Sequence, residues 1–185
     1  MNDYSKAEKV SAAAPAGVAS TVSGPSGSNT ATAATLEAPS GFIPLNSGRN
    51  PFVDSVGPLW VHREEGRAGR LAMGIRIEPR HCSPSGFCHG GMLLTLADML
   101  VVMGTSVQTG INRFMTTVSL SSDFLAAVPQ GAWIEGRLDI LRTTRTLIFC
   151  QGLFRVEGEP VLRVDGIVKP IGEEREGSKL SRYFD

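Results

Sequence analysis

The chain has 185 residues, and its 18 Lys and Arg residues balance its 18 Asp and Glu residues, so the formal net charge is zero. This balance argues against a protein that binds nucleic acids or membrane surfaces through bulk positive charge. Three cysteines are too few for a disulfide framework, and no apolar run approaches the roughly 18 residues of a membrane span. We therefore expect a small soluble protein of the cytoplasm, with neither a nucleic-acid nor a membrane partner.

The first 45 residues differ in composition from the rest. In residues 11–40, 25 of the 30 positions are Ala, Ser, Gly, Thr or Pro, and Glu37 carries the only charge. Such a segment has few large side chains to bury, so it cannot offset the entropy cost of ordering. We predict a disordered arm over 1–45, a folded domain over 46–173 and a C-terminal tail over 174–185. A mitochondrial transit peptide is the alternative, but the stretch has no Arg and no amphipathic period.

The expected elements of the domain begin with a turn or short helix near residues 50–60, whose large apolar side chains favour a core position. Alternation over 71–77 predicts a half-buried strand, and glycines and prolines over 81–91 predict a loop. The apolar segment 92–107 predicts one helix that is buried on most sides. Four further strands are expected at 116–124, 132–141, 147–156 and 161–171. This order indicates an α+β fold, with an antiparallel sheet wrapped around one long central helix.

Asp98 is the exception in this helix. Apolar residues precede and follow it, and Thr95 is the only other polar residue before Thr105. A buried carboxylate is costly unless it is paired. A narrow solvent-facing stripe would explain Asp98 without any function. The helix has no matching polar stripe, however, so we favour a functional carboxylate.

The start of the helix provides a second candidate feature, the sequence His89-Gly90-Gly91. The first N–H groups of a helix lack partners within it, glycine permits close approach, and the helix dipole favours negative charge there. Such a terminus can stabilise an oxyanion, although a tight turn is the plainer explanation. Gly90 and Asp98 are eight residues apart, about 12 Å along one helix. If both act on one carbonyl, two chains must contribute them, which predicts a homodimer with antiparallel helices.

A resemblance to a known family is carried by HCSPSGFCHGG at 81–91 and LAD at 96–98. These segments resemble the H-x-N-x-x-G-x-x-H-G-G…L-x-D pattern of PaaI-like hotdog-fold thioesterases, and the likeness covers about residues 50–171. It implies a hotdog fold and the hydrolysis of acyl-coenzyme A thioesters. It also implies dimers or dimers of dimers with sites at the subunit interface. No metal or separate cofactor is implied, because coenzyme A is part of the substrate.

The same resemblance implies roles for individual residues. Asp98 corresponds to the general base or nucleophile, and the backbone N–H of Gly90 would polarise the thioester carbonyl. His89 would shape the loop, and Thr117 would help to place the attacking water. Ser83 stands where the family usually has Asn, and a serine can hold a water but reaches less far.

Other candidates are Gly91, beside the oxyanion donor, and Arg142 and Arg145, which could bind the phosphates of coenzyme A. A solvated hairpin corner is the plainer explanation for the two arginines. Two Cys and two His residues in the loop before the helix make a zinc set conceivable. Their spacing is unusual for zinc, and we expect Cys82 and Cys88 to be small buried side chains.

Two alternatives to an acyl-CoA thioesterase remain open. Ser83 leaves room for a non-catalytic hotdog protein that binds acyl-CoA or acts as a regulatory or assembly module. A hotdog hydratase would use a different Asp/His pair, which we do not find in the sequence. The acyl group, the choice between dimer and tetramer, and the choice between base and nucleophile for Asp98 are left open by the sequence.

Overall fold

The structure is a computed structural model that describes residues 38–46, 48, 50–64, 70–175 and 183. These residues belong to one unit of the chain, which spans Thr35–Asp185. Most of the arm expected over 1–45 therefore lies outside the described residues, as does most of the tail expected over 174–185.

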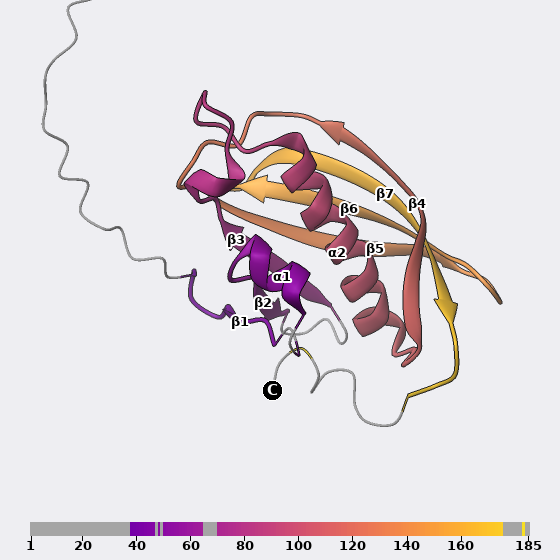
Figure 1. Ribbon diagram of the computed structural model, residues 1–185. Coiled ribbons are helices and arrows are strands. Elements are labelled where there is room, and N and C mark those ends of the chain that lie inside the picture. Colours follow the sequence, from indigo (N-terminus) through magenta and orange to yellow (C-terminus); the bar gives the residue numbers. More distant parts are fainter. Residues whose placement is uncertain (1–37, 47, 49, 65–69, 176–182, 184–185) are drawn as a thin grey trace, which may run out of the picture. The chain divides into compact units, whose positions relative to one another are not determined.

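Helix α2 (Gly90–Thr109) lies against one face of an antiparallel sheet that curves around it (Figure 1). The neighbouring strands follow the order β1-β2-β3-β5-β6-β7-β4, so β4 pairs with β7 at one edge. The strands are β1 (Ile43–Pro44), β2 (Trp60–Arg63), β3 (Leu71–Arg76), β4 (Phe114–Phe124), β5 (Trp133–Thr143), β6 (Ile148–Val156) and β7 (Glu159–Ile171). This is the predicted architecture, and the predicted helix and five longer strands agree with it to within two residues at each end.

The sheet covers only one side of α2. The buried side chains of the helix are Leu93, Leu96, Ala97, Leu100, Val101, Met103, Thr105, Ser106 and Val107. On the opposite side Gly91 and Asp98 are exposed, while Leu94, Met99 and Val102 are half-buried. The prediction that this helix is buried on most sides is therefore confirmed only for the side that faces the sheet. By length and composition α2 could also cross a membrane, but half of it is buried inside the fold, as in a core helix.

Glycines permit the closest approach between α2 and the sheet. A Cβ at Gly104 would lie 2.9 Å from Cδ2 of Leu138 on β5, and a Cβ at Gly166 on β7 would lie 2.9 Å from Cγ1 of Val101. Real Cβ atoms essentially never approach so closely, so these positions favour the residue without a side chain. The two contacts determine how near α2 lies to β5 and β7.

The domain begins earlier than the sequence indicated. Helix α1 (Pro51–Val56) confirms the short helix expected there, and the side chain of Asn50 caps its first turn. Before it, however, β1 pairs with β2, and the Phe42 ring contacts the rings of His62 and Trp133. The boundary predicted at 46 is therefore a few residues too late. The cause is a short apolar run from Phe42 that the small residues before it obscured.

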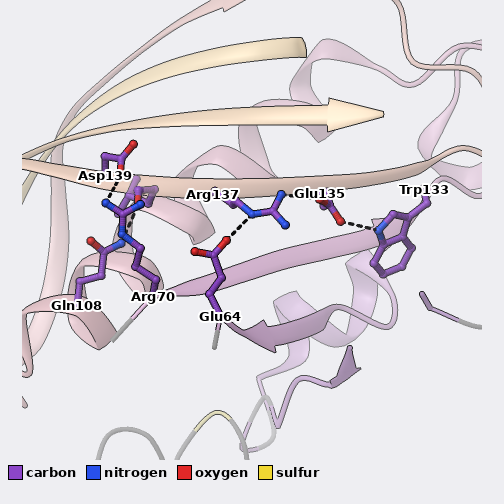
Figure 2. Close-up of polar contacts among 8 residues, drawn as sticks. Glu64, Arg70, Gln108, Trp133, Glu135, Arg137 and Asp139 are labelled. Carbon is purple, nitrogen blue, oxygen red and sulfur yellow. Dashed lines mark hydrogen bonds and ion pairs between the residues drawn. The ribbon is translucent and has the colours of Figure 1, made fainter. Parts of the chain in front are cut away.

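A polar network covers the outer face of β3 and β5 (Figure 2). Arg137 on β5 bonds both Glu64 and Glu135, and Trp133 Nε1 donates to Glu135. Burial alone would lower the pKa of Arg137, but the two carboxylates outweigh that effect and raise it. Because Arg137 is exposed, its ion pairs contribute little to stability.

The loop before α2 is closed by a pair of facing cysteines. Ser83 N–H donates to Phe87 O at 2.9 Å and His89 N–H to His81 O at 2.8 Å, so Cys82 and Cys88 lie directly opposite each other. A pair flanked by its hydrogen bonds in this way has the closest side chains of an antiparallel ladder. Both thiols are free and half-buried, rather than fully buried as expected.

His81 does not form a metal site with these thiols, because both of its ring nitrogens form hydrogen bonds. Its Nδ1 accepts from Glu78 N–H at 3.0 Å, so its Nε2–H donates to Val56 O at 2.7 Å. Both ring nitrogens are therefore engaged: Nδ1 within the turn over 78–81, and Nε2 with the last residue of α1, which it holds against the loop. Within the part of the chain that the structure describes, no three His, Cys, Asp or Glu residues are grouped to hold a metal ion.

We predict that Gly104→Ala lowers the free energy of unfolding by up to about 2 kcal/mol, because overpacking against Leu138 outweighs the better helix propensity of alanine. Gly91→Ala is the matched control on the same helix, because no heavy atom lies within 4 Å of its added Cβ. Urea unfolding of both variants measures the difference. Equal effects at the two positions would contradict the packing described for α2.

A second prediction concerns the reactivity of Cys88. Burial, with a smaller contribution from the neighbouring Cys82, raises the pKa of the Cys88 thiol to about 11. Because the thiolate is the reactive form, alkylation of Cys88 should be slow at pH 7 and should rise about tenfold per pH unit to pH 10. Peptide-resolved mass spectrometry after iodoacetamide treatment measures this rate. A rate that levels off near pH 8.5, where an ordinary cysteine titrates, would contradict the environment described for Cys88.

Candidate active site

Asp98 faces the side of α2 that the sheet leaves uncovered. Its carboxylate is exposed in the single chain, so the expectation of a buried carboxylate is wrong for one chain alone. Thr117 on β4 donates its hydroxyl proton to Oδ1 of Asp98 at 2.7 Å. Thr117 pairs with Val168 next to an irregularity in the β4–β7 register. The structure therefore brings together two of the residues that the resemblance singled out.

The Asp98–Thr117 pair lines a cavity of about 510 Å³. One wall is α2 from Asp98 to Ser106, and the other is the beginning of β4 up to Thr117. Arg175, Tyr183, and residues of α1 and the segment before it complete the lining. Among them is Phe52, which is 59% exposed. Phe52 is one of the large apolar side chains near residues 50–60 for which the sequence predicts a core position. Its side chain instead borders this cavity, whose existence depends on α1 lying opposite α2.

The N-terminus of α2 has backbone donors without a side-chain cap. His89 is the N-cap residue, and its carbonyl accepts from the N–H groups of Met92 and Leu93. Gly90 and Gly91 are the first two helical residues, and neither N–H has a hydrogen-bond partner among the described residues. Unpartnered donors at a helix N-terminus suit a negatively charged oxygen.

Gly90, with its backbone donor, and the Asp98 carboxylate line different cavities. Gly90 lines a second hollow of about 470 Å³, together with Leu93 and residues 124–128 at the end of β4. Gly90 and Asp98 are separated by two turns of α2, about 12 Å. In one chain, therefore, the two groups do not face a common reacting atom.

The loop residues predicted for the site lie apart from Asp98. The Ser83 hydroxyl lies 2.6 Å from that of Ser85 and also bonds Phe87 O, so it supports the turn between the two cysteines. The His89 side chain is exposed and makes no capping hydrogen bond. Neither residue lines either of the two cavities described above.

Arg142 and Arg145 are exposed at the hairpin between β5 and β6, as the plainer explanation predicted. The register places Thr143 in the same row as Thr117, separated by β6 and β7. Three strand spacings amount to about 14 Å. Within one chain, the two arginines therefore lie away from the Asp98–Thr117 pair and outside both cavities.

Sequence reasoning missed the residues that build the far end of the Asp98 cavity. Arg113 and Phe114 precede the predicted strand, and Arg175 falls in the predicted tail, yet all three line the cavity. A predicted strand that began at Phe114, as β4 does, would have drawn attention to Arg113 and Phe114. The position of Arg175 at the cavity depends on its hydrogen bond to residue 112, a contact that no local sequence pattern reveals.

Comparisons with known proteins identify the family of this chain. A family model described as the thioesterase superfamily matches residues 85–162. A Pseudomonas aeruginosa protein described as a "putative esterase" is 33% identical over 100 residues, which cover 54% of this chain and 72% of that protein.

Solved structures show the same fold. The PaaI protein of the Escherichia coli phenylacetic acid degradation operon aligns with a TM-score of 0.61 and 15% identity, over 69% of this chain and 88% of that one. A hypothetical thioesterase of Streptococcus pneumoniae, solved with coenzyme A, aligns with a TM-score of 0.55 and 17% identity, over 62% of this chain and 91% of that one. The chain belongs to the thioesterase superfamily and has the hotdog fold of PaaI-like thioesterases.

Proposed function

We propose that the protein hydrolyses acyl-coenzyme A thioesters at sites formed jointly by two copies of the chain. Family membership and the Pseudomonas relative support a hydrolase, and the coenzyme A in the Streptococcus structure supports this class of substrate. The observation that carries the proposal is the hydrogen bond between Asp98 and Thr117 inside a cavity of substrate size.

The reaction needs little beyond a carboxylate, a water and oriented donors. A thioester carbonyl is electrophilic, and a thiolate is a fair leaving group. Thr117 engages Oδ1 of Asp98, which leaves Oδ2 without a hydrogen bond from the described residues. Oδ2 either attacks the carbonyl, giving a mixed anhydride that water then hydrolyses, or removes a proton from the attacking water. In both routes the carbonyl oxygen becomes an oxyanion that backbone N–H groups can stabilise.

The dimer is supported by two uncovered surfaces. Strand β4 is at the edge of the sheet, and Phe114, Val118 and Phe124 on it are 53–55% exposed. Next to it, α2 presents the half-buried side chains Leu94 and Val102. An apolar edge strand is a template for pairing with another chain. Both surfaces would be covered if two copies paired along β4.

Such pairing would also bring together the Asp98 carboxylate and the Gly90 N–H, which lie apart in one chain. A two-fold axis beside β4 would set the two α2 helices side by side and antiparallel. The partner subunit's Gly90 would then approach Asp98, although Gly90 of the same chain lies about 12 Å away. Each dimer would contain two sites, and each site would use one carboxylate and one helix N-terminus from different chains.

We expect Asp98→Asn to lower kcat/KM on the preferred acyl-CoA by about 10²–10⁴-fold, the usual range for removal of an acid or base group. A panel of aliphatic and aryl acyl-CoAs with detection of the released thiol measures the rate and identifies the acyl class. Because Asp98 is exposed in the single chain, the thermal midpoint of the variant should change little. Hydrolysis at the wild-type rate by Asp98→Asn would contradict the assignment.

Thr117 provides the matched control for this experiment. Thr117→Val removes the donor to Asp98 but keeps the shape of the side chain, and Thr117→Ser keeps the donor. The valine variant should lose activity and the serine variant should retain most of it. If the folded wild-type protein hydrolyses no thioester in the panel but binds acyl-CoA, the non-catalytic alternative replaces the proposed function.

A further inference from the structure

The Asp98 cavity carries opposite charges at its two ends. Among the described residues that line it, the charged ones are Asp98, Arg113 and Arg175. At one end of the cavity, Asp98 accepts a hydrogen bond from Thr117. Arg113 lies four residues before Thr117 along the chain. Phe114 and Thr117 are three residues apart on β4 and therefore about 10 Å apart, and Arg113 precedes Phe114. A molecule in this cavity therefore meets a carboxylate at one end and two guanidinium groups at the other.

The two arginines are held in place by contacts around the beginning of β4. Arg113 Nε donates to Gly172 O at 2.7 Å. Arg175 N–H donates to Asn112 O at 2.7 Å, and its guanidinium carbon lies 5.8 Å from the centroid of the Phe114 ring. These contacts tie the end of β7 and the residues after it to the start of β4, and they bring both guanidinium groups to the same end of the cavity.

Both guanidinium groups keep donors for a ligand. Neither Arg113 nor Arg175 forms an ion pair among the described residues, whereas Arg70, Arg137 and Arg163 do. The carboxylate of Glu174, the nearest along the chain, accepts the N–H of Asn112 instead. An arginine presents five N–H donors in a planar fork that suits a carboxylate. Two such forks at one end of a cavity favour a ligand with a negative charge there.

Four apolar side chains line the wall between the charged ends. They are Met99, Val102 and Met103 of α2 and Met115 of β4. These four side chains suit a hydrocarbon chain, and the polar residues Asn46, Asn50 and Ser106 also line the cavity. A negative charge at the far end of that chain would be attracted by the arginines and repelled by Asp98, which would direct the reacting carbonyl to Asp98.

We propose that Arg113 and Arg175 bind the terminal carboxylate of the acyl group, so that the preferred substrates are thioesters of dicarboxylic acids. The proposal rests on the thioesterase function proposed above and specifies the acyl class for that same site. The arginines act on specificity: they contact the far end of the acyl chain and take no part in the bond-breaking step.

The test compares suberyl and octanoyl thioesters, which differ in a terminal carboxylate, each on coenzyme A and on N-acetylcysteamine, which has no phosphate. Wild type should prefer suberyl thioesters on both thiols. In the double variant Arg113→Gln/Arg175→Gln, we expect kcat/KM to fall tenfold or more for both suberyl thioesters, mainly through KM, and to stay within twofold for the octanoyl thioesters. Arg63→Gln/Lys169→Gln, which removes two exposed charges outside the cavity, is the matched control.

Two outcomes would overturn the proposal. One is a loss of kcat/KM for both coenzyme A thioesters and for neither N-acetylcysteamine thioester. In that case the arginines would bind the phosphates of coenzyme A. The other is an equal effect on suberyl and octanoyl thioesters, or no effect on either.

A binding measurement separates this proposal from the proposed function. Calorimetry with the Asp98→Asn protein needs no turnover, and it should show tighter binding of the suberyl than of the octanoyl N-acetylcysteamine thioester. The added changes Arg113→Gln/Arg175→Gln should abolish that difference. Failure of wild type to hydrolyse any thioester would contradict the proposed function alone, whereas equal binding of the two ligands would contradict the carboxylate site.

Discussion

Helix α2 holds the oxyanion donors and the carboxylate of the candidate site at a separation that one chain cannot change. Gly90 starts the helix, Asp98 lies two turns further on, and a regular helix sets their distance at about 12 Å. Because the helix is packed against five strands of the sheet, β3 to β7, it cannot bend to bring them together. Any reaction that uses both groups on one carbonyl therefore requires a second helix.

The same helix carries an apolar surface that the single chain leaves uncovered. One side of α2 is buried by the sheet, with glycines at the closest contacts. The other side carries Asp98 among half-buried apolar side chains, beside the uncovered edge strand β4. Thr117 connects the helix to that strand through its bond to Asp98. Packing thus positions the carboxylate at the surface where a second chain would dock.

The architecture was largely predictable because it depends on local patterns. The long apolar segment of α2 and the alternation in β4–β7 are visible in the sequence, and their order leaves few ways to form one sheet around one helix. The loop motif and Asp98 also stood out, because a charge in an apolar helix and paired glycines before it are rare. The geometric argument for two chains needed only the spacing of Gly90 and Asp98.

What the sequence did not reveal depends on contacts between distant segments. The exposure of Asp98 follows from which side of α2 the sheet covers, and the periodicity of an almost wholly apolar helix does not indicate that side. Phe52 was expected in the core because of its size, yet the position of α1 leaves it bordering a cavity. Arg175 reaches the same cavity through contacts with Asn112 and Phe114, which lie 63 and 61 residues earlier in the chain.

The sharing of each site between two chains is best tested by mixing two inactive variants. Asp98→Asn removes the carboxylate, and Gly90→Pro removes the N–H donor at the first helical position, where proline fits. His89 already has the extended backbone that a following proline prefers. A Cβ at Gly90 would lie 3.3 Å from the ring of Phe124, a contact that a displacement of a few tenths of an ångström relieves.

After subunit exchange in an equal mixture, half of the dimers should contain one of each variant, by random pairing. Each mixed dimer has one site with both an intact carboxylate and an intact donor, so thioester hydrolysis should recover to about a quarter of the wild-type rate. If the two groups acted within one chain, every chain would lack one of them. Activity of the mixture no higher than that of the separate variants, with subunit exchange verified by mass, would contradict the shared site.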